Sequence, residues 1–445
     1  MKLFGTDGIR TRAGVFPLNQ AAILAIGQAI GEELGGRILV GEDTRTSSPW
    51  ILGLAIEGIN RSGRSHAEPA GVIPTPAVAL LTRAHSFSGG IMISASHNPF
   101  EDNGIKVFSR DGTKLTDEVE ARIEGRIAQL LPAGVEAITD SVPDLNPSQD
   151  TRTRWLRRYE ELLASHFPQG RWLAGKRIIA DCANGAMSVV APEVLRALGA
   201  DVRPICATPT GRNINASCGA VHPETLMSAM KEGVADFGVA FDGDGDRSLF
   251  VSGSGKLVDG DAVLLVMSRR IKPSCVVGTS MTNYALEKKL ESDGVGLTRV
   301  AVGDRFIFEE MQRSGATLGG EPSGHIIFSD FRLSGDGLLT TLKLAQAMVE
   351  TTQSLDDLTR DWSPAPQMLK GVRVSQRVPL ESMNRLQATM LDASAALNGY
   401  GRLVVRYSGT EPLLRVMIES DDARRNDEWM KKILRAIEED FENLR

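Results

Sequence analysis

Three stretches of the chain repeat one order of apolar and polar positions: residues 37–63, 176–205 and 275–300. Each opens with a short β-branched apolar run. A small polar turn then leads into a segment with helical apolar spacing that ends near glycine, and a second predicted strand follows. Strand, helix and strand in this order form a βαβ unit, which builds parallel sheets covered by helices. Their spacing of roughly 100 residues predicts three related α/β domains, since solenoid repeats span only ~20–50 residues.

Polar and proline-rich segments predict the domain boundaries. Residues 143–155 are polar and turn-rich, which indicates a linker, and residues 252–261 predict a hairpin or loop that leaves the second unit. The clearest break lies at 362–369, and strands and helices after it follow a shorter α+β pattern. We therefore predict three related α/β domains with mixed sheets flanked by helices, followed by a smaller C-terminal α+β domain. Their predicted ranges are 1–148, 149–250, 251–364 and 365–445.

The composition narrows the class of partner. The 445 residues include 50 Lys+Arg and 56 Asp+Glu, a net charge of -6, and only 5% aromatic residues, which argues against nucleic-acid binding. The first residues lack the apolar core of a signal peptide, and no stretch approaches the roughly 18 unbroken apolar residues of a membrane span. We therefore expect a cytoplasmic protein without membrane partners. The distant cysteines Cys182, Cys206, Cys218 and Cys275 fit neither a zinc knuckle nor a disulfide framework, which predicts reduced, mostly buried thiols.

An acidic stretch at 241–250 carries the most specific chemistry. Asp242, Asp244 and Asp246 alternate with glycine, so in extended backbone their carboxylates would point the same way. Three neighbouring carboxylates repel one another unless a cation lies among them, and oxygen-only ligands favour Mg²⁺ beside a phosphate. An EF-hand is excluded because the sixth position is Arg247 and the twelfth is Gly253. An acidic surface turn stays open as an alternative, although the preceding apolar strand places the loop at a strand's carboxyl end.

Three other motifs combine polar side chains with tight turns. In residues 89–108, Ser96 and His97 follow a predicted strand, and Lys106 lies on the next one. The adjacent serine and histidine would suit a hydrolase, but the G-x-S-x-G motif of that class is missing. A purely structural role for this turn remains an alternative. Residues 319–325, GGEPSGH, suit hydrogen bonding to sugar hydroxyls, with a plain turn as the alternative. Residues 406–415, RYSGTEPLLR, combine hydroxyls, glycine and two arginines, which favours a phosphate site. For Arg10 and Arg305 the sequence leaves two alternatives open, a place in the functional site or a place on the surface.

Together these motifs resemble the α-D-phosphohexomutase superfamily, and the resemblance covers almost the whole chain. It is carried by FGTDGIR (4–10), ISASHNPFEDNGIKVFSRDGTKL (93–115), DGDGDR (242–247), GEPSGH (320–325) and RYSGTEPLLRVMIE (406–419). GTDGIR, VGDR and GTSMTNYAL resemble the branch acting on glucosamine phosphates more than the phosphomannomutase/phosphoglucomutase branch. The resemblance implies four domains around a central cleft. It also implies interconversion of glucosamine 6- and 1-phosphates through a phosphoserine and a 1,6-bisphosphate, which supplies the route to UDP-N-acetylglucosamine.

The resemblance also implies a role for each motif residue. Ser96 would carry the phosphoryl group and complete the shell of one Mg²⁺ per subunit with Asp242, Asp244 and Asp246. Protons would be handled by Lys106 and His325, and charge would be stabilised by Arg10 and Arg247. Glu321 and Ser323 would hold sugar hydroxyls, and the non-reacting phosphate would bind Arg406, Ser408, Gly409, Thr410 and Arg415. A phosphosugar substrate, glucosamine or glucose 1,6-bisphosphate as activator, and a homodimer are further implications.

Two positions depart from the pattern, and three alternatives stay open. Pro322 stands where relatives usually have Gln, Met or Asn, and proline donates no backbone N–H. Tyr407 stands where many relatives have a smaller or different residue. The alternatives are the same chemistry on glucose or mannose phosphate, a non-catalytic phosphosugar-binding protein, and a metal-dependent phosphatase. The phosphatase would not need the sugar and phosphate loops together.

Overall fold

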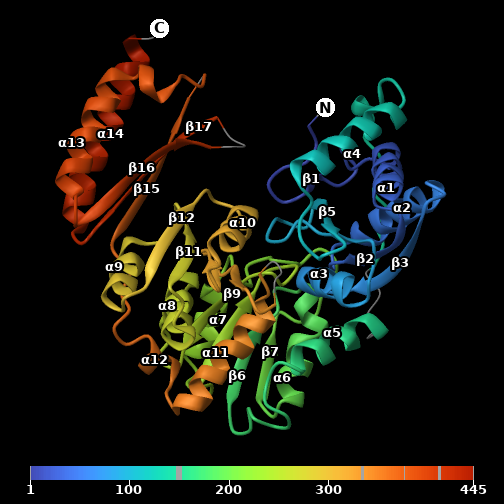
Figure 1. The fold of residues 1–445 in the computed structure, drawn as a ribbon, viewed down its shortest axis with the longest axis horizontal. Coiled ribbons are helices and arrows are strands. Elements are labelled where there is room, and N and C mark those ends of the chain that lie inside the picture. Colours follow the sequence, from blue (N-terminus) through green and yellow to red (C-terminus); the bar gives the residue numbers. More distant parts are fainter. Residues whose placement is uncertain (1, 147–152, 332–334, 375, 409–411, 444–445) are drawn as a thin grey trace.

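Four sheets follow one another along the chain and divide it into four domains. The computed structural model describes residues 2–146, 153–331, 335–374, 376–408 and 412–443. Figure 1 shows the domains in an arc, with the first (blue) and fourth (red) at its ends and the other two between them. Within the described ranges, no helix is long and apolar enough to cross a membrane. The four sheets confirm the predicted fold, three α/β domains followed by a small C-terminal domain.

Domain I contains a mixed five-stranded sheet in the order β1-β5-β4-β2-β3. The parallel pairing of β2 with β3 confirms the first predicted βαβ unit, and β5 runs antiparallel to both β4 and β1. The side chain of Asn19 caps α1 by accepting from the Ala22 N–H. The elements are β1 (Ile9–Arg12), α1 (Gln20–Leu34), β2 (Gly36–Glu42), α2 (Ser48–Arg61), β3 (Ser65–Val72), α3 (Thr75–Ala84), β4 (Gly89–Ile93), β5 (Asp102–Ser109), α4 (Asp117–Leu130) and the 3₁₀ helix η1 (Val135–Ala137).

Domain II repeats this design with the order β10-β9-β8-β6-β7. β6 and β7 are parallel, as the second repeat predicts. The predicted boundary after residue 250 falls inside β9, and β10 pairs with β9 as a hairpin, so this sheet extends to Val258. The elements are α5 (Arg154–Ala164), β6 (Arg177–Asp181), η2 (Ala186–Val189), α6 (Ala191–Ala197), β7 (Asp201–Ile205), α7 (Glu224–Met230), β8 (Phe237–Phe241), β9 (Ser248–Ser252) and β10 (Leu257–Val258).

Domain III contains a four-stranded sheet in the order β12-β11-β13-β14. β11 and β12 are parallel, which confirms the third repeat, and β13 and β14 form a short antiparallel hairpin. The elements are α8 (Gly260–Ile271), β11 (Cys275–Thr279), α9 (Tyr284–Ser292), β12 (Gly296–Val300), α10 (Asp304–Ser314), β13 (Leu318–Gly320), β14 (Ile326–Phe328), α11 (Gly337–Thr351) and α12 (Leu355–Leu358).

Domain IV is a three-stranded antiparallel sheet, β15-β17-β16, with α13 and α14 packed against one face. Leu414, Val416 and Ile418 share one apolar cluster with the two helices. A larger cluster contains side chains from domains I, II and III together, so those three form one base and domain IV has its own core. The elements are β15 (Gln367–Arg373), η3 (Leu380–Ser382), α13 (Asn384–Leu397), β16 (Gly401–Tyr407), β17 (Leu413–Ser420) and α14 (Ala423–Asn443).

Candidate active site

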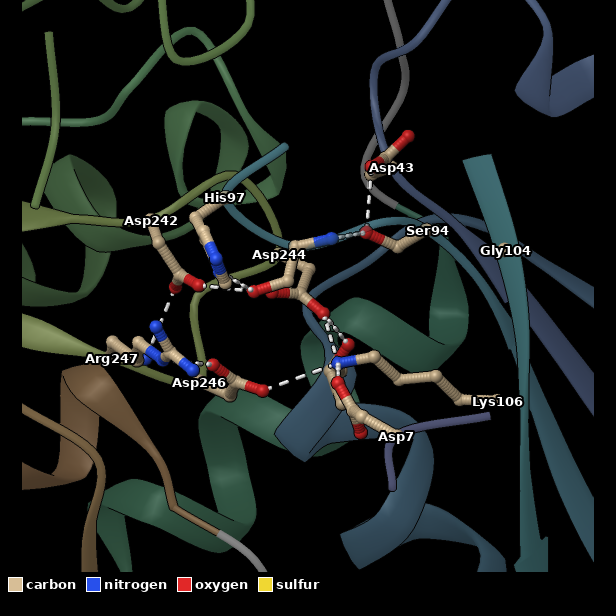
Figure 2. Close-up of polar contacts among 12 residues, drawn as sticks. Asp7, Asp43, Ser94, His97, Gly104, Lys106, Asp242, Asp244, Asp246 and Arg247 are labelled. Atoms are coloured by element: carbon tan, nitrogen blue, oxygen red, sulfur yellow. Dashed lines mark hydrogen bonds and ion pairs between the residues drawn. The ribbon is translucent and has the colours of Figure 1, made fainter. Parts of the chain in front are cut away.

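The acidic loop begins directly after β8 and forms a tight turn. The extended backbone predicted there is wrong: the Gly245 N–H donates to the Asp242 carbonyl at 3.1 Å, and Gly245 has φ +75°. Glycine adopts this left-handed conformation without strain, so the alternating glycines build a turn. The carboxylates of Asp242, Asp244 and Asp246 still converge, with one oxygen of each within 4.8 Å of the others, and all three residues are buried (Figure 2).

Backbone groups from three domains hold this loop. The Thr75 N–H of domain I donates to the Asp244 carbonyl at 2.9 Å, and the Gly337 N–H of domain III donates to the Gly245 carbonyl at 3.0 Å. A Cβ on Gly243 would come within 2.5 Å of the Ser96 carbonyl oxygen, so only glycine allows this approach. The position of the acidic loop therefore depends on how domains I, II and III pack together.

Ser96 lies against this loop in a conformation that non-glycine residues avoid. Its φ is +53°, its exposed fraction is 1%, and its hydroxyl donates to Asp242 Oδ2 at 2.6 Å. Its carbonyl accepts from Arg45 Nη2 at 2.8 Å and from Asn215 Nδ2 at 2.9 Å. Strained backbone persists only where surrounding contacts hold it, and such strain clusters at functional sites. The structure thus brings the predicted serine and the predicted aspartates together.

Lys106 extends from β5 into the acidic loop (Figure 2). Its Nζ lies 2.7 Å from Asp244, 3.2 Å from Asp246 and 3.1 Å from Asp7. Burial lowers the pKa of Lys106, but these carboxylates outweigh burial and hold the pKa well above its ordinary value. Asp7 also pairs with Arg10, which places that predicted residue at the same site.

His325 follows the β13–β14 turn and lies between two carboxylates. Its Nδ1 is 3.8 Å from Asp246, and its Nε2 is 3.9 Å from Asp304. Burial lowers the pKa of His325, and the surrounding carboxylates raise it above the ordinary value. However, the Gly335 N–H donates to Nε2 at 2.8 Å, which requires a lone pair there and opposes the imidazolium. The hydrogen-bond geometry therefore assigns the neutral ring, with its proton on Nδ1 facing Asp246.

His97 and Arg247 flank the serine and the aspartates. His97 Nδ1 lies 3.3 Å from the Ser96 hydroxyl, and burial followed by the charges of Arg247 and Arg10 lowers the pKa of His97 to about 4. Burial also lowers the pKa of Arg247, but Asp246 and Asp242 hold it above the ordinary value. Both groups therefore keep one charge state near neutral pH, His97 neutral and Arg247 positive.

Burial raises the pKa of Asp242, and the neighbouring Asp246 and Asp244 raise it further. A divalent cation would reverse this effect. Among the described residues, Asp244 Oδ1 and Asp246 Oδ1 are buried oxygens without a hydrogen-bond partner. A donor set of three carboxylates and the Ser96 hydroxyl contains oxygen only, and therefore fits Mg²⁺.

The predicted sugar loop is the tight turn between β13 and β14. Glu321 accepts the Gly303 N–H at 3.1 Å, and the Ser323 hydroxyl lies 3.3 Å from the same carboxylate. Pro322 needs no N–H in this turn, because its carbonyl makes the contact by accepting the Gly260 N–H at 3.0 Å. The proline therefore fits the local fold, and Glu321 and Ser323 lie side by side as the motif predicts.

Two arginines of domain IV point the same way. Arg406 and Arg415 pair directly across β16 and β17, and directly opposed residues share a face. That face is opposite the helices, because Val405, Leu414 and Val416 pack against the helical core. Ser408 follows β16 and is buried. The predicted phosphate-binding residues Gly409 and Thr410 lie outside the described residues.

Sequence reasoning missed several groups that complete the site. Asp7 and Asp304 lie inside quoted motifs, but no pattern assigned them a role, and His97 was set aside with the hydrolase hypothesis. Arg45 and Asn215 bind the Ser96 carbonyl from segments that are distant in the sequence. Their neighbouring residues therefore carry no pattern that predicts the contact. Arg305 pairs with Asp117 at 2.5 Å and with Glu309 at 2.7 Å.

A four-domain fold that holds a serine against an acidic triad is typical of enzymes that transfer phosphoryl groups. Comparison with known proteins identifies the family. Models described as phosphoglucomutase/phosphomannomutase alpha/beta/alpha domains I, II and III match residues 1–132, 158–255 and 259–365. The model of the C-terminal domain matches residues 369–436. The chain belongs to the phosphoglucomutase/phosphomannomutase family.

Individual relatives narrow the comparison. A phosphoglucosamine mutase of Solibacter usitatus is 44% identical over 446 residues, covering 98% of both chains, and one of Koribacter versatilis is 42% identical, covering 98% of this chain and 97% of its own. A phosphoglucomutase/phosphomannomutase family protein of Burkholderia thailandensis superimposes with a TM-score of 0.80 at 21% identity, covering 98% and 97% of the chains. An N-acetylphosphoglucosamine mutase of Aspergillus fumigatus, solved with GlcNAc-6P and magnesium, gives 0.65 at 18% identity, covering 99% and 96%. These structures show that the fold is shared.

Proposed function

We propose that this enzyme is a phosphoglucosamine mutase that interconverts glucosamine 6-phosphate and glucosamine 1-phosphate through phosphorylated Ser96. The observation that carries the proposal is the buried Ser96 hydroxyl, 2.6 Å from Asp242 in an acidic loop held by three domains. The phosphoglucosamine mutases that are 40–44% identical along the whole chain support the choice of sugar.

The reaction would proceed in two transfers. In the first, the bond between phosphorus and Ser96 Oγ breaks and a bond to O1 of glucosamine 6-phosphate forms, while O1 gives up its proton and Ser96 Oγ takes one up. The 1,6-bisphosphate then turns end for end. In the second transfer, phosphorus returns from O6 to Ser96 Oγ, the Ser96 hydroxyl gives up its proton, O6 takes one up, and glucosamine 1-phosphate leaves. Such transfers depend on positioning and charge stabilisation, so a preorganised site suits them.

The residues of the site would divide this work. One Mg²⁺ held by Asp242, Asp244, Asp246 and the phosphoserine would neutralise charge on the transferring group. Arg10 and Arg247 would stabilise the remaining negative charge. Lys106 and His325 would handle protons. A cation among the aspartates would weaken their hold on Lys106 and lower its pKa toward the range of a proton donor.

The substrate would be held from two sides. Glu321 and Ser323 would hydrogen-bond the sugar hydroxyls, and the non-reacting phosphate would bind Arg406, Ser408, Gly409, Thr410 and Arg415. The bidentate geometry of arginine suits a phosphate presented from either end of the sugar. An activating 1,6-bisphosphate, a cytoplasmic location and a homodimer are part of the same proposal.

A ³¹P NMR time course tests this function. The protein, Mg²⁺ and a trace of glucose 1,6-bisphosphate are mixed separately with glucosamine, glucose and mannose 6-phosphates at equal concentration. Fast conversion of the glucosamine compound, and loss of that conversion in Ser96→Ala, are the expected results. Equal or faster conversion of glucose or mannose phosphate would assign the other sugar branch, and accumulation of inorganic phosphate would indicate a phosphatase.

A further inference from the structure

Two cysteines and an aspartate converge at the edge of the domain II sheet, outside the active site. Asp181 ends β6, Cys206 follows β7, and Cys218 lies in the loop between β7 and α7. One ligand atom of each lies within 4.8 Å of the others. Asp181 and Cys218 are buried, whereas Cys206 is partly exposed. The sequence spacing did not predict this cluster, because the two thiols meet only when the loop folds back.

The chemistry of the cluster suits a thiophilic divalent cation. Two sulfurs and one carboxylate oxygen are ligands typical of Zn²⁺, which takes four ligands in tetrahedral geometry. A Zn–S bond is about 2.3 Å long, so ligands of one tetrahedral ion lie about 3–4 Å apart, and the separations within this cluster are close to that range. The fourth position would be filled by water, because Cys206 opens to solvent.

Outer hydrogen bonds already orient these side chains. The carboxylate of Asp181 accepts the Ala183 N–H at 3.0 Å and the Gly219 N–H at 2.9 Å. The Asn184 amide nitrogen lies 3.7 Å from Cys218 Sγ. Its amide orientation is fixed on both sides, since the nitrogen donates to the Asn213 carbonyl and the oxygen accepts the Thr208 N–H. Metal ligands are commonly oriented by such outer contacts.

Backbone strain is concentrated around the same cluster. Nine non-glycine residues of the described chain have positive φ, and five of them belong to this cluster or to the segments that hold it: Ala183, Asn184, Cys206, Asn215 and Ser217. Left-handed backbone is strained for residues with a Cβ and persists only where surrounding contacts hold it, so this concentration indicates a segment that its contacts hold firmly. Cys206 itself is one of the strained residues, with φ +47°.

The strained loop also reaches the reactive serine. Asn215 Nδ2 donates to the carbonyls of Ser96 at 2.9 Å and Asn98 at 3.1 Å. The Asn215 N–H donates to the Ala183 carbonyl at 2.9 Å, and the Ala183 N–H binds Asp181. A movement of Asp181 or Cys218 would therefore be transmitted to the contact that holds Ser96.

We propose that Asp181, Cys206 and Cys218 form a binding site for a thiophilic divalent cation of the zinc class, and that its occupancy lowers turnover by displacing Asn215 from Ser96. Binding replaces two S–H protons, which leave to solvent. The thiols remain reduced, so no oxidant takes part. This site is separate from the acidic triad, whose ligands are oxygens alone.

Binding is tested with cadmium, whose bond to thiolate gives an ultraviolet charge-transfer absorption. The chelator-treated, reduced full-length protein is titrated with Cd²⁺ in excess Mg²⁺, which keeps the acidic triad saturated. We expect absorption that saturates at one ion per chain and is displaced by Zn²⁺. It should disappear in Cys206→Ser, a partly exposed position where serine keeps the size of the side chain, and persist in the matched control Cys275→Ser. No absorption, or equal absorption in Cys206→Ser, overturns the site.

The coupling to turnover has its own readout and rests on the proposed function. We expect Zn²⁺ in excess Mg²⁺ to lower kcat at least about threefold in the wild type and in Cys275→Ser, with KM little changed. Cys206→Ser should lose this sensitivity. Inhibition that persists in Cys206→Ser assigns the zinc effect to the acidic triad and overturns the coupling, as does cadmium binding without any change in kcat. The absorption measurement stands even if the mutase assignment fails.

Discussion

At the scale of single residues, Ser96 shows how the site holds a conformation that its own sequence disfavours. Its left-handed φ of +53° is stabilised by Arg45 and Asn215, which bind its carbonyl. For a residue with a Cβ, this conformation costs about 1–2 kcal/mol relative to right-handed backbone, whereas glycine adopts it freely. The strain is therefore a property of the backbone at residue 96, separate from its hydroxyl.

Comparing Ser96→Ala with Ser96→Gly isolates this strain. Both variants lose the hydrogen bond to Asp242 and should lose phosphoryl transfer, so they differ only in the Cβ. We expect Ser96→Gly to be the more stable of the two by about 1 kcal/mol, because glycine relieves the left-handed strain. Urea denaturation at one pH measures the difference. A more stable Ser96→Ala would show that the backbone at residue 96 is not strained.

Glu42 is a buried acid that destabilises the fold as pH rises. Its exposed fraction is 8%, and Oε2 has no hydrogen-bond partner within the described part of the chain. Burial, followed by the charge of Asp43, raises the pKa of Glu42 from 4.5 to about 8. The unfolded chain loses this proton near 4.5 and the folded chain only near 8, so the contribution of Glu42 to stability falls between those pH values.

Glu42→Gln should remove this dependence. We expect the free energy of unfolding of the variant to exceed that of the wild type increasingly from pH 5 to pH 8, by of the order of 3 kcal/mol at the upper end. Urea denaturation across this range gives the difference, with the exposed Glu101→Gln as control. A constant difference between Glu42→Gln and wild type would show that Glu42 is ionised in the fold.

At the scale of helices and strands, the sequence predicts what local periodicity determines. The three βαβ units and the hairpin after β9 appear as predicted, because alternation and helical spacing follow from burying one face. The extended backbone predicted for the acidic loop was wrong, because alternating glycines permit a turn as readily as a strand. Contacts such as Asn215 with Ser96 could not be predicted, since they depend on how distant loops pack.

A helix-to-helix contact gives an element-scale prediction. The Tyr159 hydroxyl on α5 donates to Asp336 at 2.8 Å, and Asp336 caps α11, whose Gly337 N–H holds the acidic loop. Burial raises the pKa of Asp336 to about 6, so at pH 8 the hydroxyl binds a carboxylate. Tyr159→Phe should cost about 1–3 kcal/mol at that pH and lower kcat a few-fold. Tyr400→Phe, at an exposed position, is the control, and equal stabilities of the two variants would contradict this role.

At the scale of the whole molecule, a ring of six polar side chains, in which lysines and a histidine alternate with aspartates, joins the first three domains. Lys106 connects Asp246 with Asp7, and Lys114 connects Asp7 with Asp304, at 2.6 Å from each. His325 is the sixth member: its Nδ1 faces Asp246, whereas Nε2, which accepts the Gly335 N–H, lies 3.9 Å from Asp304 without a hydrogen bond to it. Burial lowers the pKa of Lys114, but Asp304 and Asp7 outweigh it and hold the pKa above the ordinary value. The ring thus fixes both proposed proton-handling groups through contacts between domains.

Lys114→Met tests whether the ring supports catalysis. The variant leaves Asp7 and Asp304 without the cation they share, and breaking a partly buried ion pair should cost about 1–3 kcal/mol. We expect kcat to fall about tenfold or more while KM changes little, because Lys106 and His325 lose their shared frame. Lys343→Met is the matched control, since Lys343 has a similar exposure and also lies 2.6 Å from an aspartate, Asp330, but within one domain. If both variants lose stability equally and keep the same kcat, the ring only holds the domains together; a fall in kcat confined to Lys114→Met ties the packing of domains I and III to the chemistry at Ser96.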